Sequence, residues 1–225
     1  MSTGADPFAS YRGPLQARLQ EALADDATAH AVLLRQHSAA LPESSRLPAL
    51  LCLLTADALA GRAEQALPAA ASLVLLAEMS RVFAAIGGEG HAGGGLAATW
   101  GMPRALNAGD GFFVVAQSAL LDADAGLDEE QRLRALSILD EAARAISEEQ
   151  CQAAPSEVAG HRALFEAGAS LGAVFAGADA ATASRFAAFG RALGEGAPDE
   201  AQIAGLGAKA RERLALAARY VMEAR

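Results

Sequence analysis

The segment from Ala63 to Ile86 constrains the fold most, because it is apolar on nearly every side of a helix until Glu78 and Arg81 near its end. A helix without a polar face is normally buried by its neighbours. We therefore expect this segment to form the central helix of a bundle, with the rest of the chain around it.

The composition favours helices over strands. The sequence contains 59 alanines but only 8 valines and 4 isoleucines, so the residue with the highest helix propensity is abundant and the β-branched residues typical of strands are scarce. Glycine and proline divide the chain into stretches that we predict to be helical. These stretches are residues 14–38, 47–60, 63–86, 103–121, 128–151, 155–178, 180–193 and 199–223.

The sequence shows no domain linker and no repeat, so we predict an all-α fold in one domain, residues 1–225. We expect residues 1–12 to be flexible. The segment 87–95, GGEGHAGGG, holds six glycines in nine positions. That much backbone freedom is incompatible with a helix, so we predict a mobile loop there.

Charge and cysteine content exclude several functions. The formal net charge is −9 and no basic stripe is visible, which argues against nucleic-acid binding. Cys52 and Cys151 lie far apart without metal-ligand spacing, so we expect free thiols in a reducing compartment. The N-terminus lacks the apolar core of a signal peptide, and the longest uncharged runs, 66–77 and 167–178, are too short to span a membrane. We expect a soluble, cytoplasmic protein without a membrane span.

Several segments follow one another in a characteristic order over most of the chain: SRLPALLCLLTADAL, ALPAAASLVLLAEMS, WGMPRALNAGDGFF, ISEEQ, ALFEAGASLGAVFAGA, FAAFGRALG and LAARYVMEAR. In this order they resemble the trans-isoprenyl diphosphate synthases, also called polyprenyl synthetases. The resemblance implies an all-α bundle around a deep apolar cavity. It also implies a reaction in which an allylic diphosphate ionises and condenses with isopentenyl diphosphate, assisted by carboxylate-bound Mg²⁺ and by basic residues.

The positions that the resemblance assigns to this chemistry carry other residue types. The aligned residues are Ala84, Ala85 and Gly88 for the first Asp-rich motif, Gly90 and His91 for an arginine pair, Glu43, Ser44 and Ser45 for a Gly-Lys-Arg element, and Gly160 and His161 for a Lys-Thr pair. The second Asp-rich motif is replaced by EGAPDEAQIAGLG, without paired aspartates. Among the polar positions of the family that we can align with this sequence, only Gln150 and Asp110 keep the family's residue. We therefore expect no Mg²⁺ cofactor, no metal site and no conventional prenyl transfer.

The remaining polar residues give candidate sites with a structural alternative for each. Glu78 and Arg81 are three residues apart on one helix face, so they either orient a ligand in the cavity or form an ion pair. Glu89 and His161 are candidate acids or bases, but residues of these types in such positions are more often solvated or structural.

Three further positions complete the candidates. Gln150 either lines the cavity or bonds a neighbouring helix. Phe83 precedes the former aspartate positions, so we expect it to face the space that a diphosphate would occupy. His30 and His37 share a helix face, but two histidines alone make a weak metal site.

Three functions remain open. The first is a non-catalytic member of the fold that forms a homodimer, or a heterodimer with an active prenyl diphosphate synthase, since the family commonly forms dimers through its central helices; such a protein would also suit a hydrophobic small molecule. The second is a metal-independent terpene or natural-product enzyme that uses the apolar cavity, with Glu78, Glu89 or His161 moving a proton. The third is conventional prenyl transfer with metal ligands that the alignment misses.

Overall fold

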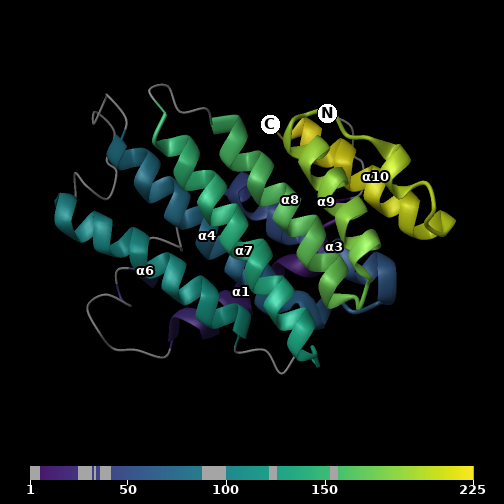
Figure 1. Cartoon of the computed structure of the whole chain (residues 1–225), viewed down its shortest axis with the longest axis horizontal. Coiled ribbons are helices and arrows are strands. Elements are labelled where there is room, and N and C mark those ends of the chain that lie inside the picture. The colour runs from purple at the N-terminus through teal and green to yellow at the C-terminus, as the bar shows by residue number, and fades with distance from the viewer. Residues whose placement is uncertain are drawn as a thin grey trace.

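The computed structural model describes residues 6–24, 42–87, 100–121, 126–152 and 157–224, together with Val32, Leu34 and Arg35. All regular structure in these residues is helical (Figure 1). The α-helices are α1 (Ala9–Ala24), α3 (Leu47–Ala60), α4 (Leu67–Gly87), α6 (Met102–Leu121), α7 (Glu129–Gln150), α8 (Glu157–Phe175), α9 (Ala180–Gly194) and α10 (Ala208–Glu223). The all-α prediction is confirmed.

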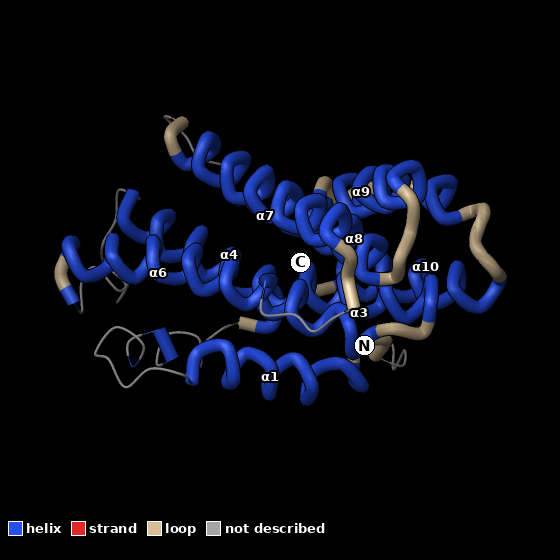
Figure 2. Tube along the Cα trace, turned by 60° about the horizontal axis from the view of Figure 1, so that its bottom comes forward, coloured by secondary structure: helices blue, strands red, loops and turns tan. Residues whose placement is uncertain are grey.

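Helix α4 lies inside the bundle, as its all-round apolar sequence predicts. Every residue from Ala69 to Met79 is buried, and the helix contacts α1, α3, α6, α7 and α8. Figure 2 shows α1 along one side of α4, α6 at one edge of the molecule, and α9 and α10 at the opposite edge. The Ser72 hydroxyl donates to the carbonyl oxygen of Ala116 in α6 at 2.7 Å, so this buried polar side chain of α4 is hydrogen-bonded to a neighbouring helix.

The N-terminal prediction is wrong for the described residues. Helix α1 begins at Ala9 and contains Pro14 in its interior, whereas we expected flexible residues up to 12 and a helix starting at Pro14. An internal proline removes one helical hydrogen bond. Burial offsets that loss here, because Phe8 and Tyr11 are 0% and 6% exposed. The remainder of the predicted 14–38 helix lies largely outside the described residues.

Most other helix boundaries follow local signals. Asp128 and Gln131 form a reciprocal capping box at the start of α7, and Gly61 ends α3 in a left-handed conformation with φ 67°. The predicted helix 199–223 is divided instead. A 3-10 turn, Glu200–Ile203, is capped by Asp199, and α10 starts only at Ala208 after two glycines. Cys52 and Cys151 are both free thiols, as expected.

Glycines bring α8 into close contact with α3 and α9. A Cβ atom built on Gly172 would lie 2.8 Å from the Thr55 Cβ and even closer to the Cys52 carbonyl oxygen in α3. Gly190 of α9 faces α8 in the same way, with its Cβ position 2.9 Å from the Ala169 Cβ. Real Cβ atoms do not approach this closely, so these positions accept only glycine at the observed helix separation.

A charged cluster joins the two ends of the chain. The Tyr11 hydroxyl of α1 donates to Asp57 Oδ2 of α3 at 2.7 Å, and Arg213 Nη2 of α10 donates to the same oxygen at 2.7 Å. Burial alone would raise the pKa of Asp57, but these two hydrogen bonds and the nearby cations lower it below the ordinary value of 3.8. The ionised carboxylate therefore holds α1 and α10 against α3.

Replacing this carboxylate gives a stability prediction with a pH signature. A group whose pKa is lowered by folding stabilises the protein above its ordinary pKa, and that contribution is lost as pH falls through the lowered value. At neutral pH we expect Asp57→Asn to lower the free energy of unfolding by about 1–2 kcal/mol, since charged hydrogen bonds at a partly exposed site are lost. Urea unfolding at neutral pH and at pH values below 3.8 measures the effect.

The difference between the wild type and Asp57→Asn should shrink in acid, because the wild-type carboxyl is then also neutral. Asp140→Asn is the matched control. Asp140 accepts a hydrogen bond from Gln117 at the surface, and an asparagine oxygen can still accept it, so we expect a change within about 0.5 kcal/mol. An equal loss of stability in both variants would contradict the assignment.

Candidate functional site

The C-terminal half of α4 carries an ion pair formed by two of the candidate residues. Glu78 is fully buried, and its Oε1 lies 2.9 Å from Arg81 Nη1. The Arg81 side chain is 41% exposed, so the pair runs from the core toward the surface. The structure thus forms the ion pair that was one of the two interpretations of these residues. A role in orienting a ligand stays a prediction.

Gln150 ends α7 and bonds to α4. Its amide nitrogen donates to the Ser80 carbonyl oxygen at 2.8 Å and lies 3.3 Å from the Ser80 hydroxyl. This bond fixes the C-terminal end of α7 beside α4. Of the two uses proposed for Gln150, the structure supplies the interhelical one.

Phe83 contacts a neighbouring helix. A Cβ atom on Gly109 of α6 would lie 2.6 Å from the Phe83 ring, so the ring lies flush against the α6 backbone. Ala84 and Ala85, at the positions aligned with the first Asp-rich motif, are exposed methyl groups. Phe83 therefore packs between α4 and α6, and its expected position facing a ligand stays a prediction.

Several candidates cannot be placed. Glu89, His91, His30 and His37 lie outside the described residues, as does most of the glycine-rich segment 87–95. His161 belongs to the first turns of α8, and its side chain lies outside the described part. Within the described part of the chain, no group of three His, Cys, Asp or Glu side chains is arranged to hold a metal ion.

Glu149 is a buried carboxylate that sequence reasoning missed. It is 7% exposed, and its side chain makes no ion pair or hydrogen bond with a described residue. A signal was available, because the buried positions of α7 recur at helical spacing and reach residue 149. These are Ala135, Leu139, Ala142, Ile146 and Glu149. Glu149 therefore lies on the inward face of α7, next to the residue that bonds α4.

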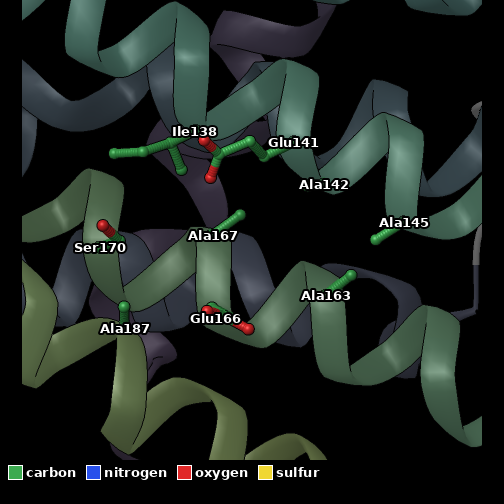
Figure 3. A pocket seen from close by; sticks show the side chains of 9 residues that line it. All are labelled: Ile138, Glu141, Ala142, Ala145, Ala163, Glu166, Ala167, Ser170 and Ala187. Atoms are coloured by element: carbon green, nitrogen blue, oxygen red, sulfur yellow. The ribbon is translucent and has the colours of Figure 1, made fainter.

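A groove of about 200 Å³ opens between α7 and α8 (Figure 3). Its walls are alanine methyl groups from Ala142, Ala145, Ala163, Ala167 and Ala187. The side chains of Ile138, Glu141, Glu166 and Ser170 complete the lining. No residue of α4 takes part, so this groove is separate from the apolar cavity expected beside the central helix, which stays a prediction.

The outward side of α6 exposes large apolar side chains. Met102 and Leu106 are each 41% exposed, Val114 59% and Leu121 49%, and Leu133 near the start of α7 is 60% exposed. We call these five residues the outer apolar face. In Figure 1, α6 lies at the edge of the molecule. Exposed apolar side chains grouped on one element mark interaction surfaces more often than isolated ones do.

One helical stretch of the described residues is long and apolar enough to span a membrane by length and composition alone. It runs from Glu64 to Ile86 with a mean hydropathy of 1.7, and 67% of its most apolar window is buried inside the fold. The sequence analysis considered only uncharged runs, and the run in this stretch ends before Glu78, so it did not select the stretch. A core helix passes the same test, and the burial of this stretch agrees with that role.

Comparisons with known proteins identify the fold. The chain matches no family model and no curated protein. Among solved structures, it resembles geranylgeranyl pyrophosphate synthetase from the archaeon Geoglobus acetivorans, with 22% identity, a TM-score of 0.73, and coverage of 84% of this chain and 66% of that one. It spans 62–63% of two further synthetases, from Pyrococcus horikoshii and Streptomyces coelicolor. The chain has the isoprenoid synthase fold.

Two plant structures match over nearly their whole length. The geranyl diphosphate synthase small subunit from Antirrhinum majus is 16% identical with a TM-score of 0.72, and the match covers 99% of this chain and 94% of that one. A chain of the mint heterotetrameric geranyl pyrophosphate synthase is 18% identical with a TM-score of 0.74, covering 95% of this chain and 98% of that one. This chain is similar to both in fold, and the mint structure is that of a deletion mutant.

Proposed function

We propose that this chain, with its isoprenoid synthase fold, is a non-catalytic subunit that pairs with an active prenyl diphosphate synthase. The observation that carries the proposal is the outer apolar face. Five large apolar side chains on α6 and the start of α7 are 41–60% exposed. Fully burying one such side chain contributes about 1.5–3 kcal/mol. Covering the half-exposed set would contribute on the order of 5 kcal/mol before the costs of association.

The comparisons support a subunit of this kind. Two matches that cover nearly all of both chains are a geranyl diphosphate synthase small subunit and a chain of a deletion mutant of a heterotetrameric geranyl pyrophosphate synthase. The longer synthetases extend well beyond this chain, which spans 62–66% of their length.

The residue types at the former diphosphate positions support the same proposal. Ala84 and Ala85 end α4 with methyl groups, and methyl groups offer no oxygen ligand to Mg²⁺. Near the start of α3, Glu43 stands where the resemblance places a phosphate anchor, and its carboxylate pairs with Arg12 at 2.6 Å. The carboxylate of Glu43 would repel a diphosphate. Its ion pair with Arg12 instead links the start of α3 to α1 and stabilises the fold.

A second candidate function is metal-independent chemistry in the apolar interior. The observation that favours it is Glu149, a carboxylate buried on the inward face of α7 without an ion pair to a described residue. A buried carboxyl can move a proton in a water-poor site. Turnover of a neutral terpenoid that is abolished by Glu149→Gln would favour this function over the subunit.

The loss of diphosphate chemistry predicts a simple binding result. Calorimetric titration of the purified chain with farnesyl diphosphate should give no Mg²⁺-dependent heat, and labelled isopentenyl diphosphate should not be incorporated. An active prenyl diphosphate synthase, titrated in the same buffer, is the positive control. Tight binding that requires Mg²⁺ would overturn the proposal and restore conventional prenyl transfer.

A further inference from the structure

We propose that the groove between α7 and α8 binds a slender organic monocation, an unbranched alkyl chain that ends in a primary ammonium group. The proposal is independent of subunit association, because the groove shares no residue with the outer apolar face. Three properties of the groove carry it: the shape of the walls, the charge at the rim, and one buried hydroxyl.

The walls select a narrow apolar ligand. Alanine methyl groups from α7, α8 and α9 face one another across the groove, and their short side chains leave a volume of about 200 Å³ between the helices. That volume corresponds to roughly six groups the size of a water molecule, at about 30 Å³ each. A short unbranched alkyl chain fits this space and removes apolar surface from water.

The rim carries one uncompensated negative charge. Glu141 and Glu166 are the two lining carboxylates. Arg191 neutralises Glu166 through a paired contact in which its Nε donates to Oε2 at 2.9 Å. Glu141 makes no ion pair or hydrogen bond with a described residue and lies exposed at the groove. The charge that complements this rim is therefore a single positive one.

Ser170 supplies a hydroxyl group at the groove. Its side chain is only 6% exposed, yet it lines the groove, and its hydroxyl points from α8 toward α7 (Figure 3). An ammonium group carries a positive charge and three N–H donors, which suit the Glu141 carboxylate and the Ser170 hydroxyl oxygen, whereas an alcohol offers one donor and no charge.

A titration with n-pentylammonium chloride, followed by ¹⁵N–¹H NMR at low salt, tests the proposal. We expect saturable shifts of the amide signals of Glu141, Ala167 and Ser170, with a dissociation constant on the order of millimolar for so small a ligand. 1-Pentanol, the neutral analogue of similar length, should bind at least about fivefold more weakly, because it lacks the charge.

Two variants and one control separate charge recognition from unspecific binding. Glu141→Gln should weaken n-pentylammonium binding about fivefold, as expected for one partly solvated charge pair. Ser170→Ala should also weaken n-pentylammonium binding. Its free energy of unfolding should equal that of the wild type, which checks that the variant folds. Glu212→Gln, which removes an exposed carboxylate of α10 away from the groove, should leave binding unchanged. Equal affinity for the alcohol, or unchanged affinity in Glu141→Gln, would overturn the proposal.

Discussion

The Gly172→Val variant is expected to lose at least about 3 kcal/mol of the free energy of unfolding, because a side chain at this position has no room. Its Cβ would lie 2.8 Å from the Thr55 Cβ and closer still to the Cys52 carbonyl oxygen. That oxygen belongs to the α3 backbone, so the clash is relieved only if α3 and α8 separate. Overpacking of this kind typically costs 1–3 kcal/mol or more, which is a large part of the stability of a typical domain.

Gly13→Ala is the matched control for Gly172→Val. Gly13 lies in α1, and a Cβ atom there would meet nothing within 4 Å. Alanine is the better helix former, but Pro14 follows and disfavours the α conformation at a residue with a Cβ, so we expect a change within about 1 kcal/mol. Urea unfolding followed by circular dichroism measures both. A Gly172→Val protein as stable as the wild type would mean that α3 and α8 do not pack at the separation described.

The Val114→Arg variant is expected to weaken association with a partner synthase at least about 100-fold while leaving the fold intact. Val114 belongs to the outer apolar face and is 59% exposed, so a charge there is solvated in the free chain. In an assembly the same charge would be buried without a counter-ion, which costs several kcal/mol, and every 1.4 kcal/mol is tenfold in affinity.

Ser184→Arg adds the same charge to an exposed position of α9, at the opposite edge of the molecule (Figure 2). We expect it to leave association unchanged. Sedimentation velocity of mixtures over a concentration series measures the affinity, and thermal unfolding of each variant alone shows whether it folds. If both variants associate like the wild type, the outer apolar face is not the interface.

Much of the fold follows from local sequence. Residues 63–86 have no polar face in their first part, and burial of the helix they form is the only outcome that satisfies the hydrophobic effect. Asp128 and Gln131 have the spacing of a capping box, which predicts a helix start at this point. The start of α1 is different, because Pro14 resembles a helix start, whereas burial of Phe8 and Tyr11 moves the start to Ala9.

The candidate site is harder to predict from the sequence than the fold is, because it depends on distances between helices. The spacing of Glu78 and Arg81 predicts their ion pair, and the pair forms. The contact of Phe83 with Gly109 needs the closeness of α4 and α6. The groove likewise exists only because alanines of three helices meet. Helix α6 cannot bury three consecutive apolar residues such as Phe112, Phe113 and Val114. The sequence does not say which of them stays exposed.

Co-expression tests the central proposal most directly. The chain would be produced together with an active prenyl diphosphate synthase from the same organism, and the mass of the purified species measured by light scattering during size-exclusion chromatography. We predict one complex whose mass includes the 22.9 kDa of this chain and the full synthase, and which separates when Val114 is replaced by arginine. Elution of the chain apart from the synthase at 22.9 kDa, at every concentration tested, would contradict its assignment as a subunit.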